Sequence, residues 1–250
     1  MTYSTHAYAP DSRNETILID INGTLFPRHE AKVSVFDAGF VLGDGVWEGL
    51  RVHPGPDGRG VVAFLDRHLK RLWEGAKTLD FDMGLTKEAL TKRLYDCLDA
   101  NKAHESVHVR LMVSRGVKST PYQDPRATIT PPTIVIIPEF KAPLATPAHA
   151  GKRLFTVHVR RTSPDTQDQK LNSHSKLNCI LACIQATKAG ADEALMLDAQ
   201  GFVATCNSTH FFIVKEDEIW TSSGDYCLGG ITRAVILEVA RADGLIAREK

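Results

Sequence analysis

The chain has 250 residues, of which 43% are hydrophobic and 24% are charged, as is ordinary for a folded protein with a hydrophobic core. Its 30 lysines and arginines balance 30 aspartates and glutamates, so the net charge gives no electrostatic basis for binding nucleic acid or an anionic membrane. No apolar run is long enough to span a bilayer, and the first residues lack the features of a secretory signal.

A hairpin and a glycine-rich segment are the first predicted features. Residues 16–21 are apolar and β-branched, which is typical of a strand, and the following Asn22 and Gly23 favour a two-residue hairpin turn. Residues 37–51 then form a glycine-rich loop that runs into an apolar segment. We expect these elements to belong to a mixed sheet.

Two helices and two strands are predicted next. Residues 64–79 have apolar side chains at helical spacing, and a second helix is expected after Thr86, whose hydroxyl can cap it. Residues 107–114 alternate as a strand with one buried face, and residues 133–137 form a continuous β-branched run typical of a buried strand.

The second half of the chain is predicted as a separate domain. Prolines interrupt the pattern, so we place a linker at residues 141–150, between domains at residues 1–140 and 151–250. Residues 175–189 are predicted as a helix, followed by a meander of strands and a helix over residues 231–240. The first of these helices is expected to bury Leu177, Ile180, Leu181 and Ile184 on one face.

Two groups of residues could bind an anion. Gly229 and Gly230 precede Ile231, Thr232 and an apolar helical stretch, and the free amides at a helix start favour a phosphate. By itself this pattern is more typical of an ordinary turn. Arg51 ends the glycine-rich segment and could recognise a phosphate, although an isolated arginine is more often a surface residue.

Lys176 is the first candidate for a nucleophilic amine. It stands in the first turn of an otherwise apolar predicted helix, where a positive charge opposes the helix dipole. Lys170 is the second candidate. His174, between them, could pair with Lys176 or a cofactor, but is expected to be a partly exposed residue at the helix start.

The cysteines and the missing motifs exclude several other kinds of site. The five cysteines lack a CxxC spacing, which argues against a disulfide framework and a structural zinc site. No motif typical of metal-dependent hydrolysis, serine esterases or Walker-type nucleotide hydrolysis occurs. We therefore expect a cytoplasmic protein without a metal site.

Four stretches together resemble the class IV, or fold-type IV, aminotransferases that depend on pyridoxal 5'-phosphate (PLP). They are residues 37–51, 68–72, 190–203 and 230–233, and their order and spacing agree over nearly the whole chain. This family includes branched-chain and D-amino-acid aminotransferases and aminodeoxychorismate lyase. The resemblance implies an α+β fold with a small N-terminal α/β domain, a larger C-terminal pseudo-barrel domain, PLP between them, and a homodimer. Relatives continue beyond the last predicted helix, so we expect this chain to lack their C-terminal tail.

The resemblance also implies roles for individual residues. Because the family's own lysine position holds Asn172, we choose Lys176 as the Schiff-base lysine, with Lys170 second. Arg110 or Arg115 could face the carboxylate of an amino acid or 2-oxo acid substrate, although either could instead face solvent. The residues implied to bind or support PLP are Arg51, Thr205, Asn207, Ser208, Gly230, Ile231 and Thr232.

Two departures from the family pattern leave the reaction open. Asn172 occupies the position of the usual Schiff-base lysine, and Thr205 replaces the glutamate that pairs with the pyridine nitrogen. A hydroxyl cannot hold a pyridinium as a carboxylate does, so the ring should be a weaker electron sink. We favour transamination of branched-chain-type substrates. The alternatives are β-elimination, as in aminodeoxychorismate lyase, and a non-catalytic relative that only binds the phosphorylated cofactor.

Overall fold

The structure is a computed structural model that describes residues 8–142 and 151–250. The described chain forms two compact units. The N-terminal unit contains residues 8–142 together with Asn172–Ser175, and the C-terminal unit contains residues 151–171 and Lys176–Lys250. The mixed α+β composition agrees with the prediction. Most of the predicted linker, residues 143–150, lies outside the described residues.

A six-stranded sheet forms the centre of the N-terminal unit. Its strand order is β2-β1-β6-β5-β3-β4, and every neighbouring pair is antiparallel. The strands are β1 (Leu18–Ile21), β2 (Thr24–Pro27), β3 (Gly45–Pro54), β4 (Gly60–Val62), β5 (Val107–Ser114) and β6 (Thr133–Phe140).

The predicted hairpin turn joins β1 to β2. Ile21 pairs with Thr24, so the connection has two residues. Asn22 and Gly23 both have positive φ, 52° and 89°. This conformation suits a type I′ turn, which Asn-Gly adopts at little steric cost, and the prediction is confirmed.

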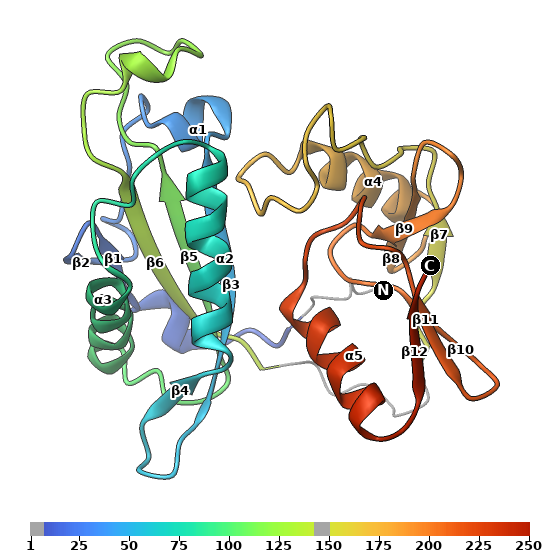
Figure 1. Cartoon of the computed structure of the whole chain (residues 1–250). Coiled ribbons are helices and arrows are strands. Elements are labelled where there is room, and N and C mark those ends of the chain that lie inside the picture. Colours follow the sequence, from blue (N-terminus) through green and yellow to red (C-terminus); the bar gives the residue numbers. More distant parts are fainter. Residues whose placement is uncertain (1–7, 143–150) are drawn as a thin grey trace. The chain divides into compact units, whose positions relative to one another are not determined.

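Helices α2 (Leu65–Thr78) and α3 (Lys87–Ala100) cover one face of this sheet (Figure 1). The predicted cap is confirmed, because the Thr86 hydroxyl accepts a hydrogen bond of 3.2 Å from the Ala89 amide. The other helical elements of the unit are short: α1 (Ala38–Leu42) and the 3₁₀ turns η1 (Ser12–Glu15) and η2 (Pro125–Ala127).

The alternation of side chains separates the two faces of β3 and β5. Val107, Val109, Leu111 and Val113 are all fully buried, as predicted, on the face that α2 and α3 cover. The residues between them point to the opposite face and are more exposed. This second face carries Arg51 and Arg110, two of the candidate site residues of the unit.

A segment from the second half of the chain completes the edge of β3. Ser173 forms an antiparallel bridge with Val46, and the Trp47 amide donates to the Asn172 carbonyl at 3.0 Å. The edge is available because β4 pairs only with the far end of β3, at Val52–Pro54. Residues more than a hundred positions apart thus meet at the start of β3.

Two three-stranded sheets and two helices form the C-terminal unit. The first sheet has the order β7-β8-β9 and the second β10-β11-β12. The elements are β7 (Leu154–Thr156), α4 (Leu177–Lys188), β8 (Glu193–Leu197), β9 (Val203–Cys206), β10 (Phe212–Lys215), β11 (Glu218–Thr221), α5 (Ile231–Ala242) and β12 (Ile246–Glu249).

The predicted buried face of α4 is wrong. Leu177, Ile180, Leu181 and Ile184 are between 44% and 64% exposed. The helix instead packs Ala182 and Ala186 against a cluster of Val157, Ala194 and Met196. Small side chains let the helix approach the sheet closely, whereas spacing alone favoured the larger residues.

Candidate functional site

A cluster of polar and aromatic side chains lies on the second face of the N-terminal sheet. Arg110 on β5 stacks its guanidinium over the Trp47 ring of β3, 3.8 Å from the centroid. Burial lowers the pKa of Arg110, and the charge of Glu139 on β6 opposes that shift. Arg110 pairs in register with Gly49, and the His108 ring lies over this glycine, 3.0 Å from where a Cβ would be. The half-buried cation is available to a carboxylate.

Arg51 lies on the same face but is exposed. Its register partner on β5 is His108, and one terminal nitrogen donates to the Lys141 carbonyl at 3.1 Å. This backbone contact fixes the direction of the guanidinium. The remaining nitrogens can still meet a phosphate.

Arg115, the second candidate for the substrate carboxylate, is bound within its own unit. It forms a two-point ion pair with Asp44, at 2.6 and 3.2 Å, and donates to the carbonyls of Leu79 and Asp80 at 2.6 and 3.2 Å. All three guanidinium nitrogens are thereby used. The structure assigns Arg115 to holding the loop after α2, so we keep only Arg110 as a candidate for the substrate.

Asn172 has a structural task at the edge of β3. Its side-chain amide donates to the Trp47 carbonyl at 2.5 Å, while its own carbonyl accepts from the Trp47 amide. The residue is 5% exposed, and its side-chain oxygen is buried without a hydrogen-bond partner among the described residues.

Lys176 ends this segment and begins the next helix. It is the N-cap residue of α4, and its carbonyl accepts the first helical bond, from Ile180 at 2.9 Å. The side chain is half-buried. Lys170 is 55% exposed and lies 3.5 Å from Asp225 in an exposed ion pair, which is the usual state of a surface lysine. Burial therefore favours Lys176 as the reactive amine.

His174 is partly exposed, as predicted, but it lies before the helix start instead of in the helix. It precedes α4, and its ring lies against β3, with Nε2 donating to the Val46 carbonyl at 3.0 Å. A Cβ added at Gly39 would lie 2.7 Å from this ring, and one at Gly45 would lie 2.8 Å from it. Gly39 and Gly45, two of the four glycines in residues 37–51, thus leave space for the ring, and at Gly45 the Val113 carbonyl, 2.5 Å from the same position, also excludes a side chain. Neither of the two has a positive φ.

Because desolvation lowers the pKa of His174, its burial should make stability depend on pH. The unfolded histidine, with a pKa of about 6.5, binds a proton more readily than the folded one, so the free energy of unfolding should rise with pH up to about 6.5. Asp37 and Asp44 oppose the shift, whereas Arg110 adds to it. Urea denaturation between about pH 5 and pH 7 should show a steeper rise in the wild type than in His174→Gln. Equal slopes would contradict this prediction.

In the C-terminal unit, a rigid turn follows β9. The Thr205 hydroxyl donates to the Thr209 carbonyl at 2.9 Å, and the Cys206 amide donates to the same carbonyl at 3.1 Å. Glu193 accepts from the Ser208 hydroxyl at 3.0 Å and from the Thr209 hydroxyl at 2.8 Å. Burial raises the pKa of the neighbouring Cys206 thiol to about 11. The turn is therefore held by hydrogen bonds from several sides.

Three predicted cofactor residues belong to this turn, and their side chains are already engaged. Asn207 accepts from the Ala194 amide at 2.8 Å and extends the pairing of β8, and Ser208 bonds to Glu193. These two side chains support the turn. Because the Thr205 hydroxyl already donates its hydrogen bond to the Thr209 carbonyl, the Thr205 oxygen can only accept a further hydrogen bond.

The start of α5 has the properties that an anion site requires. Gly230 is its N-cap, and no side chain caps the helix. The amides of Ile231 and Thr232 belong to the first turn, where they have no partner within the helix, and Thr232 adds a hydroxyl. Ile231 and Thr232 thus supply the donors at this helix start, whereas the Gly230 amide already donates to the Leu228 carbonyl at 2.7 Å.

The structure brings His210 to this helix start, a contact that the sequence did not predict. The His210 ring occupies the space where a Cβ of Gly230 would lie. The turn of Thr205, Asn207 and Ser208 and the start of α5 therefore meet through His210. In the sequence, only Gly230 pointed to this contact, because the helical spacing of the apolar residues gives no reason for a glycine at that position.

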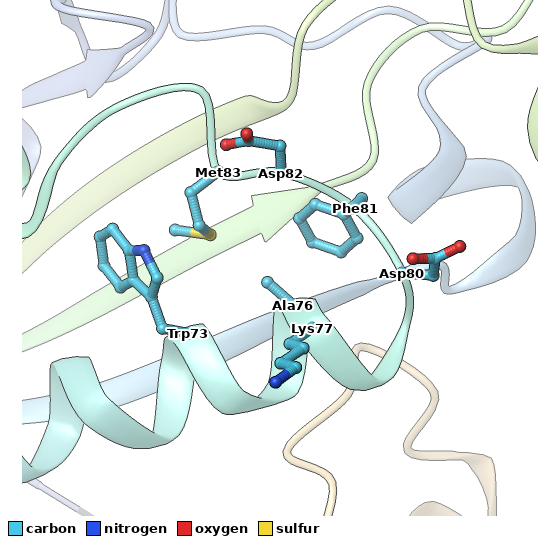
Figure 2. A pocket seen from close by; sticks show the side chains of 7 residues that line it. All are labelled: Trp73, Ala76, Lys77, Asp80, Phe81, Asp82 and Met83. Carbon is cyan, nitrogen blue, oxygen red and sulfur yellow. The ribbon is translucent and has the colours of Figure 1, made fainter.

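A surface pocket of the N-terminal unit contains none of the predicted site residues. It has a volume of about 410 Å³ and lies between the second half of α2 and the loop that follows (Figure 2). Its lining residues are Trp73, Ala76, Lys77, Asp80, Phe81, Asp82 and Met83. The described residues contain no group of metal-binding side chains and no helix that is long and apolar enough to cross a membrane.

Comparison with known proteins identifies the family. The family model for amino-transferase class IV matches residues 45–250, so the chain belongs to this family. A "Putative branched-chain-amino-acid aminotransferase" of Methanocaldococcus jannaschii is 39% identical over 91% of this chain and 76% of its own length. The "Branched-chain-amino-acid aminotransferase-like protein 2" of Arabidopsis thaliana is 37% identical over 96% of this chain. The chain spans 42% of the length of that relative.

Solved structures agree with this assignment and confirm the fold-type IV architecture. The branched-chain amino acid aminotransferase of T.th., complexed with N-(5'-phosphopyridoxyl)-L-glutamate, matches with a TM-score of 0.85 and 26% identity. The match covers 94% of this chain and 76% of that one. The branched-chain aminotransferase of Thermoproteus uzoniensis, with norvaline, matches with a TM-score of 0.82 and 28% identity over 94% of this chain and 78% of that one.

Proposed function

We propose that the protein is a PLP-dependent aminotransferase that moves an amino group between an amino acid and a 2-oxo acid, with branched-chain-type substrates favoured. The observation that carries the proposal is the uncapped start of α5 at Gly230, Ile231 and Thr232, in a chain of the class IV family. The branched-chain preference rests on the names of the relatives.

The residues of the C-terminal unit fit the phosphate of PLP. The first-turn amides of α5 and the Thr232 hydroxyl are donors, and the positive end of the helix dipole favours a dianion. Arg51 is kept as a proposed phosphate ligand on the basis of the family resemblance alone. When bound, PLP supplies an aldehyde that captures amines and a ring that accepts the electron pair of the α-carbon.

Lys176 would hold the cofactor covalently and move the substrate proton. Lys176 is half-buried at the N-cap of α4, whereas Lys170 is exposed in a surface ion pair, and a nucleophilic amine is best shielded from bulk water. The same amine can then accept the α-proton and return it. Arg110 would bind the substrate carboxylate, because its cation is half-buried and fixed on Trp47.

Thr205 supports two alternatives with less catalytic power. Its oxygen can accept a hydrogen bond from a protonated pyridine nitrogen, but a neutral acceptor stabilises that charge less than a carboxylate. Transamination would then be slower. The two alternatives to transamination are β-elimination of the aminodeoxychorismate lyase type and binding of the cofactor without turnover. Release of pyruvate without an amino acceptor would identify the lyase.

A trapping experiment tests the proposal. The protein is mixed with PLP, reduced with borohydride and digested, and the modified peptide is identified by mass spectrometry. We expect the reduced pyridoxyl group on Lys176, together with transfer of an amino group from leucine or valine to 2-oxoglutarate. A pyridoxyl group found on Lys170 would instead identify Lys170 as the residue that attaches the cofactor. An unmodified protein that also transfers no amino group would contradict the proposed function.

We also propose that the protein acts in the cytosol as a homodimer. All five cysteines are free, which suits a reducing compartment. The dimer rests on the family resemblance. Light scattering of the purified protein at several concentrations would measure the oligomeric state directly.

A further inference from the structure

Gly230, the N-cap of α5, has a backbone conformation that does not call for glycine. Its φ of −69° and ψ of 131° lie in the extended region that any residue adopts. The reason for glycine is steric, because a Cβ would lie 2.0 Å from His210 Nε2 and 2.7 Å from His210 Cδ2. The neighbouring Gly229 has no atom within 4 Å of the corresponding position. The close approach is therefore specific to one glycine and one histidine.

His210 comes from the rigid turn after β9. Thr209, the residue before it, is held by its carbonyl, which accepts from Thr205 and Cys206, and by its hydroxyl, which donates to Glu193. Glu193 is 4% exposed on β8. The sheet thus sets the position of the imidazole, and the imidazole meets the N-cap of α5.

We propose that His210 is a positioning residue, which aims the first-turn amides of Ile231 and Thr232 at the phosphate by packing on Gly230. No side chain caps α5, so this contact is a lateral restraint on the N-cap that leaves the amides to a ligand. The inference rests on the proposed function, in that the anion is the phosphate of PLP. Beyond that function, it states that the affinity for the phosphate depends on the position of His210 in the turn after β9.

The test compares binding of PLP with binding of pyridoxal, which lacks the phosphate. Gly230→Ala should raise the dissociation constant for PLP about tenfold and leave that for pyridoxal within about twofold. Gly229→Ala is the matched control, because it adds the same methyl group in open space. We expect it to leave both constants within about twofold. Circular dichroism checks that each variant is folded.

A second variant isolates the histidine. Alanine at the N-cap is itself less favourable than glycine, but this cost is present with or without His210. In His210→Ala/Gly230→Ala the clash is removed, so the double variant should bind PLP no more weakly than Gly230→Ala. The fold-changes in the dissociation constant that the single variants His210→Ala and Gly230→Ala cause should therefore not multiply. Multiplying effects, or equal effects of Gly229→Ala and Gly230→Ala, would overturn the role of His210. A wild type that binds PLP no better than pyridoxal would instead overturn the proposed function, and this inference with it.

Discussion

Lys176→Ala is expected to abolish covalent attachment of PLP and to reduce amino-group transfer by at least about 10²–10⁴-fold, the contribution typical of a positioned acid-base group. The rate of amino-group transfer should fall by more than this factor, because the same amine also holds the cofactor. Absorbance spectra of the protein with PLP and single-turnover rates with leucine measure the two losses separately.

Lys170→Ala is the matched control for this prediction. Its amine is exposed and forms only a surface pair with Asp225, so both attachment and rate should stay within about twofold of the wild type. Added methylamine should restore part of the activity of Lys176→Ala, because a small amine can take over the proton transfer. Normal attachment in Lys176→Ala together with loss in Lys170→Ala would reassign the reactive lysine.

Local features of the fold were predictable from the sequence. The turn at Asn22 and Gly23, the cap at Thr86 and the alternating strand at residues 107–114 depend on neighbours within a few positions, and each is confirmed. The start of α5 at Ile231 also agrees with the helix predicted over residues 231–240, although the glycine pair before it is by itself more typical of an ordinary turn.

Long-range contacts were not predictable from periodicity. Asn172 bonds to Trp47 across 125 positions, and this pairing explains why the segment before α4 is irregular and why the His174 ring lies against β3. The contact of His210 with Gly230 is of the same kind. The face of α4 was misjudged because the helix carries both large apolar and small residues, and only the partner sheet selects between them.

Glu48→Leu should destabilise the protein by about 3–5 kcal/mol, the usual cost of removing one partner of a buried ion pair. Glu48 is completely buried on β3, on the face that α2 covers. Arg71 of α2 binds it at two points, at 2.8 and 2.6 Å, and His68 Nδ1 lies 2.6 Å from its carboxylate. Without the carboxylate, the half-buried guanidinium would lose its counter-ion. Urea denaturation measures the change in the free energy of unfolding.

The exposed pair on the same helix is the control for Glu48. Lys70 and Glu74 lie 3.8 Å apart with side chains 72% and 64% exposed, so Glu74→Ala should change stability by less than about 0.5 kcal/mol. Glu48→Gln separates charge from shape, because it keeps the volume and one acceptor. If it is as stable as the wild type, then hydrogen bonding and packing, and not the ion pair, hold α2 on the sheet. We expect it to be destabilised by well over about 1 kcal/mol, since Arg71 would keep its charge in a partly dry site.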